Sequence, residues 1–177
     1  MKVELKVNDK SVQVEISEEQ AKILGLAEDK PKTGYERVDE DESYFVDDTI
    51  NDGHEVIGGG GTLVNDLYYN NGNYYNDKTI AENNARADRL LRHLRQWQAQ
   101  NDEPISVEDW NNESKKKWFI IYSSEEMYAE YYYIMRLPNT IYFATKEKAE
   151  EAIEVFKDEL IWYFTEYVQR LDEVQNG

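Results

Sequence analysis

The residues of this chain with the clearest chemical potential are the carboxylates between Glu36 and Glu55. This stretch holds nine acids and one base, so it carries a net charge of −8 out of −17 for the 177 residues. Carboxylates at this density can take part in catalysis, bind a metal ion or attract a basic surface. Each of these uses requires a different spacing and different neighbours.

A metal site is the first possibility. Asp48, Asp52 and Gly53 fall at positions one, five and six of a calcium-binding EF-hand loop. Ile50 and Gly59 would then occupy positions three and twelve, where carboxylates are needed, so the match fails. The chain has no Cys and no His-x-x-x-His pair, so zinc, di-iron and iron–sulfur sites have little support. We therefore expect no metal and no cofactor.

Catalysis has no assembled signature either. Two facing carboxylates would satisfy a glycosidase, but a chain with 37 acids meets that condition by chance. The nuclease-like run Glu113-Ser114-Lys115 is better explained as a solvated loop, and no serine lies in a Gly-x-Ser-x-Gly turn. The four glycines at 58–61 lack the Gly-Lys-Ser or Gly-Lys-Thr of a phosphate-binding loop. We predict that the protein is not an enzyme and has no catalytic residues.

The strands and helices that must position these residues can be predicted from the spacing of apolar residues along the chain. Alternating residues on both sides of Asn8 and Asp9 predict a hairpin, and Ser17 with Gln20 has capping-box spacing for a short helix ending at Gly25. Further strands are predicted at 35–38, 43–50, 54–57, 118–124 and 131–137. The segments 62–75 and 101–117 are expected to be irregular. Two amphipathic helices are predicted, Lys78–Gln100 capped by Asp77 and Lys146–Val174 capped by Thr145.

These elements predict an α+β fold, in which a small β-hairpin/helix unit precedes two antiparallel-sheet-plus-long-helix modules. The expected boundaries are 1–30, 31–103 and 104–177. The stretches GNYYNDKTIAE (72–82) and TIYFATKEKAE (140–150) share an aromatic pair, a cap residue and Ala-Glu at an offset of 68 residues. We interpret them as a degenerate internal repeat with an architectural role.

The strongly acidic balance makes bare nucleic acid an unlikely partner, because phosphate binding needs clustered cations. The one appreciable cationic stretch is the first long helix, with five Lys or Arg against two acids between Lys78 and Arg95. Its Arg86, Arg89 and His93 stripe is the only candidate for contact with nucleic acid, or it pairs internally with the acidic last helix, the reading we favour. No window approaches the length of a membrane span, and no secretory signal is visible.

A positively charged protein partner remains as the functional interpretation of the acidic run. The candidate contacts are Asp39, Glu40, Asp41, Glu42, Asp47 and Asp48, with Tyr44 as an aromatic contact if it points outward. The alternative is that these acids only confer solubility.

Three stretches carry a resemblance: KTGYERVDEDESYFV, NARADRLLRHLRQWQAQND and IYFATKEKAEEAIEVFKDELIWYFTEYVQRLDE. They resemble a group of small accessory proteins encoded by phages and prophages of clostridial-type bacteria, and the likeness extends from Met1 to Glu173. The shared motifs concern strand and helix positions and include no catalytic residues, so they indicate lineage much better than activity. Some proteins similar to this one are anti-CRISPR inhibitors that bind the type II CRISPR-Cas effector nuclease.

The resemblance implies a DNA-mimicking inhibitor in the cytoplasm of the bacterial host, whose acids occupy a basic groove of the effector and prevent DNA binding or cleavage. Long-range attraction would come first, followed by pairing of carboxylates with Arg and Lys. The alternative is a phage accessory enzyme, or a binding protein for another host nucleic-acid-handling protein or a small molecule. An enzyme should show a deep pocket lined with carboxylates of perturbed pKa.

Overall fold

The structure is a computed structural model that describes residues 2–7, 10–25, 32–39, 42–48, 53–58 and 63–174. The chain divides into two compact units, Met1–Thr33 and Gly34–Gly177. The strands of the described ranges pair as three separate two-stranded antiparallel hairpins. Helices and antiparallel hairpins together make an α+β protein, as the sequence predicts.

The first unit is a hairpin followed by a short helix. Strands β1 (Lys2–Val7) and β2 (Lys10–Glu15) pair from Lys2 opposite Glu15 to Val7 opposite Lys10. Helix α1 (Glu18–Ile23) begins with the predicted capping box, in which the Gln20 amide donates to Ser17 Oγ and the Ser17 amide donates to Gln20 Oε1. The turn residues Asn8 and Asp9 lie outside the described residues.

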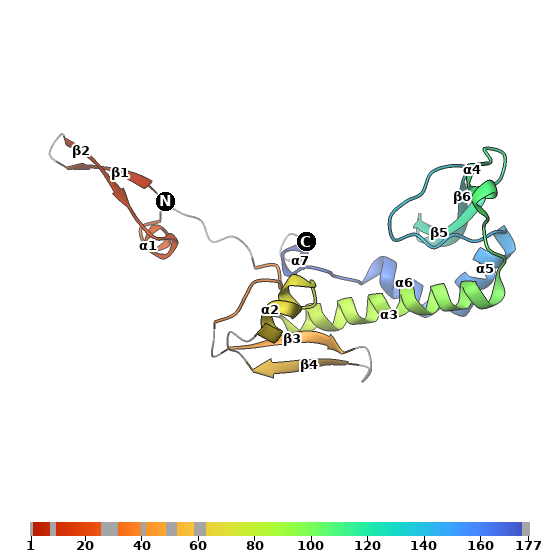
Figure 1. The fold of residues 1–177 in the computed structure, drawn as a ribbon, viewed down its shortest axis with the longest axis horizontal. Helices are drawn as coiled ribbons and strands as arrows, with labels where there is room; N and C mark the ends of the chain where they lie inside the picture. The colour runs from red at the N-terminus through yellow and green to blue at the C-terminus, as the bar shows by residue number, and fades with distance from the viewer. Residues whose placement is uncertain are drawn as a thin grey trace. The chain divides into compact units, whose positions relative to one another are not determined.

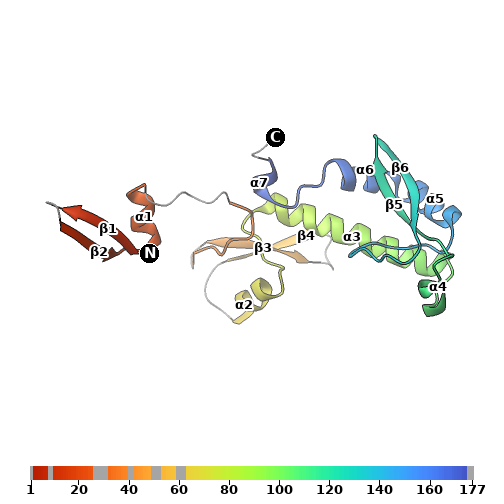
Figure 2. The ribbon, with the colours of Figure 1, turned by 90° about the horizontal axis from the view of Figure 1, so that it is seen from above.

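The second unit contains the remaining elements, which Figures 1 and 2 show from two sides. Its strands are β3 (Ser43–Asp48), β4 (Gly53–Gly58), β5 (Lys117–Ser123) and β6 (Glu126–Tyr132). Its helices are α2 (Leu63–Asn70), α3 (Lys78–Asn101), α4 (Val107–Asn111), α5 (Lys146–Val155), α6 (Lys157–Thr165) and α7 (Leu171–Val174).

The internal repeat appears in the backbone hydrogen bonding. In each half, an aromatic residue two positions before the helix cap bridges to the first strand of the hairpin. Tyr75 pairs with Phe45 through N···O distances of 2.9 and 2.7 Å. Phe143, 68 residues later, pairs with Trp118 through distances of 2.7 and 3.0 Å. The repeat therefore consists of a hairpin, a bridging aromatic and a helix.

The two helices of the repeat begin alike. Asp77 accepts a hydrogen bond from the Ile80 amide, and Thr145 accepts one from the Lys148 amide. The alanine of each Ala-Glu pair, Ala81 in α3 and Ala149 in α5, is completely buried.

Helix α3 connects the two halves of the unit, because both pack on it. Its first turns contact the β3–β4 hairpin, where Ile80 and Ala81 pack with Tyr75. Further along, Leu90 and Leu94 pack with residues of α5 and α6. Figure 1 shows the β3–β4 hairpin below the N-terminal part of α3, and β5, β6 and α5 above its C-terminal end.

Two expectations for the first half were wrong. Residues 35–38 form no strand, and the segment 62–75 is not irregular throughout, because it contains α2. Residues 63–70 carry polar Asn and Asp among their apolar residues, and helix propensity there is low. Tertiary packing stabilises this helix, since the Tyr68 ring lies against the cluster of Tyr44, Val46 and Tyr74.

The second hairpin is also shifted from its prediction. The sequence places a strand at 131–137, whereas β6 covers Glu126–Tyr132 and pairs directly with β5 across Ser124 and Glu125. Both turn residues have positive φ angles, 54° and 65°, as a two-residue type I′ hairpin turn requires. Neither is the Gly or Asn that normally signals such a turn, so the sequence conceals it.

The last helix is broken rather than continuous to Val174. It is interrupted at Phe156 and ends at Thr165. It stops there because side chains of α3 form hydrogen bonds with the Val168 carbonyl and the Tyr167 hydroxyl, which follow Thr165 in the chain. Asn83 donates to the Val168 carbonyl at 3.0 Å, and the Tyr167 hydroxyl donates to Asn84 Oδ1 at 2.8 Å. These tertiary hydrogen bonds replace helical ones, so the amphipathic spacing alone predicts too long a helix.

Candidate protein-binding surfaces

The acidic run begins with two charged residues that are used inside the fold. Glu36 Oε2 accepts hydrogen bonds from the Gly34 amide at 3.1 Å and from the Asn76 side chain at 3.2 Å. Arg37 pairs with Asp66 of α2 at 2.7 Å, and its guanidinium lies 4.1 Å from the centre of the Tyr69 ring. The one base of the run is therefore engaged by α2 rather than by the neighbouring acids.

Asp39 and Glu42 remain available for a partner. Both are exposed, and neither forms an ion pair with any residue that the structure describes. The Glu42 amide donates to the Asp39 carbonyl at 3.1 Å, which brings the two ends of the Asp-Glu-Asp-Glu sequence together. Glu40 and Asp41 lie outside the described residues. We name Asp39 and Glu42 the acidic turn.

The remaining predicted contacts belong to β3. Asp47 is half-buried, and its backbone exchanges hydrogen bonds with the Asn73 carboxamide at 2.6 and 3.1 Å. Asp48 ends the strand opposite Gly53, and its side chain lies outside what the structure describes. Asp47 is thus held in the fold on one side, and the described part of the run is not a continuous row of free acids.

Tyr44 does not point outward, so its proposed role as an aromatic contact was wrong. Its side chain is completely buried and stacks on Tyr74 with ring centres 4.2 Å apart. Its hydroxyl donates to Asn65 Oδ1 of α2 at 2.6 Å. This error follows from the failure to predict α2, because α2 covers the face of β3 from which Tyr44 projects.

A second acidic surface was not predicted, because its parts come from two helices. Trp97 and Asn101 of α3 line an open groove of about 620 Å³ together with one side of α5. Its acidic residues project at helical spacing from α5: Glu147, Glu150, Glu151 and Glu154. Sequence periodicity could reveal this acidic stripe but not the tryptophan beside it. We call this feature the α5 groove.

Three lysines partly offset the charge of the α5 groove. Their distances to the glutamates are 2.8 Å for Lys146 to Glu150, 2.7 Å for Lys148 to Glu151 and 3.9 Å for Lys157 to Glu154. These are ion pairs between neighbouring turns on the surface, which contribute little and exchange readily with other partners. The glutamates therefore remain able to pair with cations from another molecule.

The arginine stripe of α3 divides into an internal and an exposed part. Arg86 forms a two-pronged ion pair with Glu159 of α6, at 2.9 and 3.0 Å, and lies over the Trp162 ring at 4.0 Å. Arg86 thus follows the internal pairing favoured from the sequence. His93, Arg92 and Arg95 are exposed, and no ion pair to them exists within the described residues.

A further group of cations at the two ends of the second hairpin was not predicted from the sequence. Arg136 lies over the Trp110 ring at 3.9 Å, and Lys116 lies over the Tyr131 ring at 4.1 Å. Lys117 is completely buried, and its ammonium donates to the carbonyls of Asn112 and Tyr133. Burial lowers the pKa of Lys117. These cations are already engaged by the protein's own rings and carbonyls.

Among the described residues, the carboxyl groups with clearly shifted pKa values each take part in an ion pair. Hydrogen bonding to Arg86 lowers the pKa of Glu159, and hydrogen bonding to Lys115 lowers that of Asp109. Arg170 lowers the pKa of Asp172 in the same way. A catalytic acid needs a shift in the opposite direction.

The Glu159 pair gives a testable pH dependence. Because the folded-state pKa is depressed, the pair stabilises the fold above the ordinary carboxyl pKa, and this contribution is lost as the pH falls through the folded-state value. Both side chains are more than a third exposed, so the effect should stay below about 1 kcal/mol. Urea unfolding from about pH 6 to about pH 3 should show a smaller loss of stability in Glu159→Gln than in the wild type. Equal losses would show that the pair contributes nothing.

Within the described ranges, no group of three or more His, Asp or Glu side chains is arranged to hold a metal ion. None of the described helices is both long and apolar enough to cross a membrane. In the comparisons with known proteins, no family, no curated protein and no solved structure matches the chain.

Proposed function

We propose that this protein is a stoichiometric inhibitor that binds a basic groove of a larger protein and catalyses no reaction. The resemblance to phage accessory proteins identifies the type II CRISPR-Cas effector nuclease as the partner to test, in the cytoplasm of a bacterial host. Such an effector holds nucleic acid in strongly cationic channels, which carboxylates can occupy in place of phosphates. The chain's net charge of −17 favours encounter with such channels.

The observation that carries this proposal is the α5 groove. Four glutamates lie beside Trp97 in an open depression, which suits an inserted Arg or Lys side chain. The carboxylates would supply charge-assisted hydrogen bonds, and the indole ring would supply a cation–π contact. The acidic turn of Asp39 and Glu42 provides a second contact of the same sign within the same unit.

Direct binding to a purified, guide-loaded type II effector tests the proposal. Association measured by surface plasmon resonance should slow by about tenfold or more between about 50 mM and about 500 mM salt, because screening removes electrostatic attraction. Reversing Glu151 and Glu154 to lysine should weaken binding, whereas reversing Glu103 and Glu113, which lie elsewhere and are exposed, is the control with the same charge change. Equal losses of affinity in the two variants would mean that only the net charge of the protein matters, and would refute a role for the groove.

A further inference from the structure

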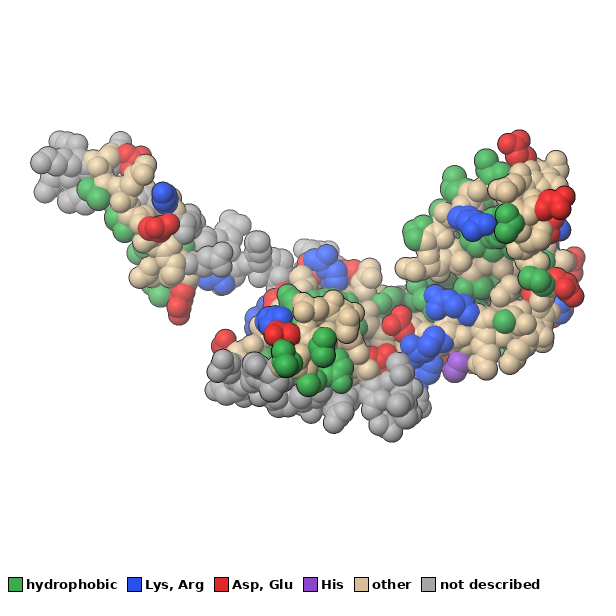
Figure 3. Space-filling view, in the orientation of Figure 1, with side chains coloured by type: hydrophobic (Ala, Val, Ile, Leu, Met, Phe, Trp, Pro, Cys, Tyr) green, Lys and Arg blue, Asp and Glu red, His purple; other side chains and the backbone are tan. Residues whose placement is uncertain are grey.

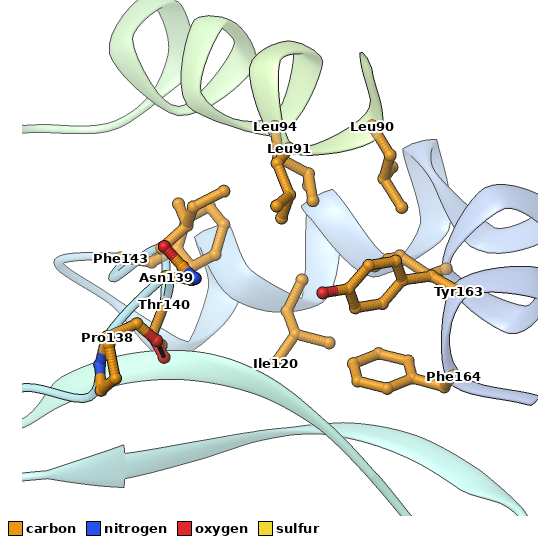
Figure 4. A pocket seen from close by; sticks show the side chains of 12 residues that line it. Leu90, Leu91, Leu94, Ile120, Pro138, Asn139, Thr140, Phe143, Tyr163 and Phe164 are labelled. Atoms are coloured by element: carbon orange, nitrogen blue, oxygen red, sulfur yellow. Dashed lines mark hydrogen bonds between the residues drawn. The ribbon is translucent and has the colours of Figure 1, made fainter. Parts of the chain in front are cut away.

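The second half of the large unit contains a pocket that neither acidic surface uses. It lies between α3, β5, the 138–141 segment and α6, and its volume is about 240 Å³ (Figure 4). Its apolar wall includes Leu90, Leu94, Ile120, Ile141, Phe143 and Leu160. Filling such a space with water leaves apolar surface hydrated, so an apolar occupant is favoured.

Three polar side chains line this space, and one of them, the Thr140 hydroxyl, already donates to the Pro138 carbonyl. The other two are Tyr163 and Asn139. In Figure 4 the Tyr163 ring extends into the pocket with its hydroxyl toward Ile120, and the Asn139 carboxamide points inward from the other side. Neither side chain forms a hydrogen bond through its polar group with any described residue. Asn139 has a φ of 57°, a left-handed conformation that asparagine tolerates, so the turn presents its side chain at this place.

The size of the pocket restricts its occupant. An engineered apolar cavity of about 150 Å³ binds benzene, whereas sites for drug-sized ligands and cofactors start at about 300 Å³. A space between these limits accommodates one or two fused rings. Side chains converge on it from α3, β5, the 138–143 segment and α6.

We propose that this pocket binds a small free aromatic molecule that carries one hydrogen-bonding group. The apolar walls contact the ring, and the Tyr163 hydroxyl or the Asn139 carboxamide pairs with the polar substituent. The site is independent of the proposed inhibitor function, because it shares no residue with the acidic turn or the α5 groove.

The test uses phenol, indole and toluene as probes of the full-length protein, with methyl NMR resonances of the pocket leucines and isoleucines as the readout. Phenol and indole should bind with a Kd on the order of 1 mM or tighter, as expected for ligands of this size. At least one of Tyr163→Phe and Asn139→Gly should weaken phenol binding by about 2- to 10-fold, the effect of one hydrogen bond, and both should leave toluene binding unchanged. Phenol binding that neither variant weakens would contradict the proposed hydrogen bond. Tyr122→Phe removes a hydroxyl outside the pocket and should change neither phenol nor toluene binding.

A further variant tests whether the probes bind in the pocket itself, by filling it with a larger side chain. Leu91 lines the pocket and is half-buried, so Leu91→Trp should fill the space and abolish binding of all three probes, whereas Leu67→Trp on exposed α2 should not. Absence of pocket shifts in the wild type at about 10 mM phenol or indole, tenfold above the expected Kd, would overturn the proposal. So would binding that survives Leu91→Trp. Tighter binding of N-acetyltryptophanamide than of indole would assign the pocket to a side chain of a partner protein instead.

Discussion

Replacing Phe143 by alanine is expected to lower the free energy of unfolding by about 3 to 5 kcal/mol. Phe143 is completely buried, and its backbone forms the bridge to Trp118 that joins the second hairpin to the helix following it. Its ring also packs edge-on against Trp97 of α3 with ring centres 6.2 Å apart. Truncation therefore leaves a cavity where three elements meet.

Urea unfolding followed by tryptophan fluorescence measures this effect. Ile134→Ala is the control, because Ile134 is 60% exposed in the same half of the unit and its loss should change stability by less than about 0.5 kcal/mol. A loss below about 1 kcal/mol in Phe143→Ala would show that the bridging aromatic does not hold the repeat together.

Reversing the acidic turn with Asp39→Lys and Glu42→Lys is expected to slow association with a basic partner by about 10-fold or more at low salt. Both side chains are exposed and unpaired among the described residues, so the change removes attraction without breaking an internal contact. Folding should change by less than about 0.5 kcal/mol. Stopped-flow or surface plasmon resonance association rates and a urea titration measure the two quantities.

The matched control for the acidic turn is Glu103→Lys with Glu113→Lys, which changes the net charge equally. Both of these glutamates are exposed outside the acidic turn and the α5 groove. An equal slowing in this control would mean that the whole protein's charge, rather than the acidic turn, steers the encounter. An unchanged rate in the Asp39 and Glu42 variant would remove the acidic turn from the proposed contact surface.

Local signals in the sequence were sufficient for the starts of α1, α3 and α5 and for the repeat, but not for α2 and α4, which lie in segments expected to be irregular. Ser17, Asp77 and Thr145 each cap the helix that they were expected to cap, because a cap depends on residues only three positions apart. Tyr75 and Phe143 are related by the predicted offset because each repeat forms the same bridge. Helix α3 ends one residue from its predicted limit, since its apolar stripe is continuous.

The errors in the last helix and at Tyr44 arose where distant residues override local preference. Asn83 and Asn84 of α3 hold the backbone after Thr165 out of a helix, and nothing in the last helix itself encodes this. The burial of Tyr44 depends on α2, a helix with weak propensity of its own. The α5 groove likewise exists only because Trp97 meets α5 in three dimensions, so spacing within one helix could not reveal it.

The inhibitor proposal is tested most directly by a DNA-cleavage assay with a purified, guide-loaded type II effector and saturating protein. We expect cleavage to stop at a stoichiometric ratio, and we expect the Asp39→Lys, Glu42→Lys, Glu151→Lys and Glu154→Lys variant to restore it. Undiminished cleavage at saturating protein would contradict the proposal.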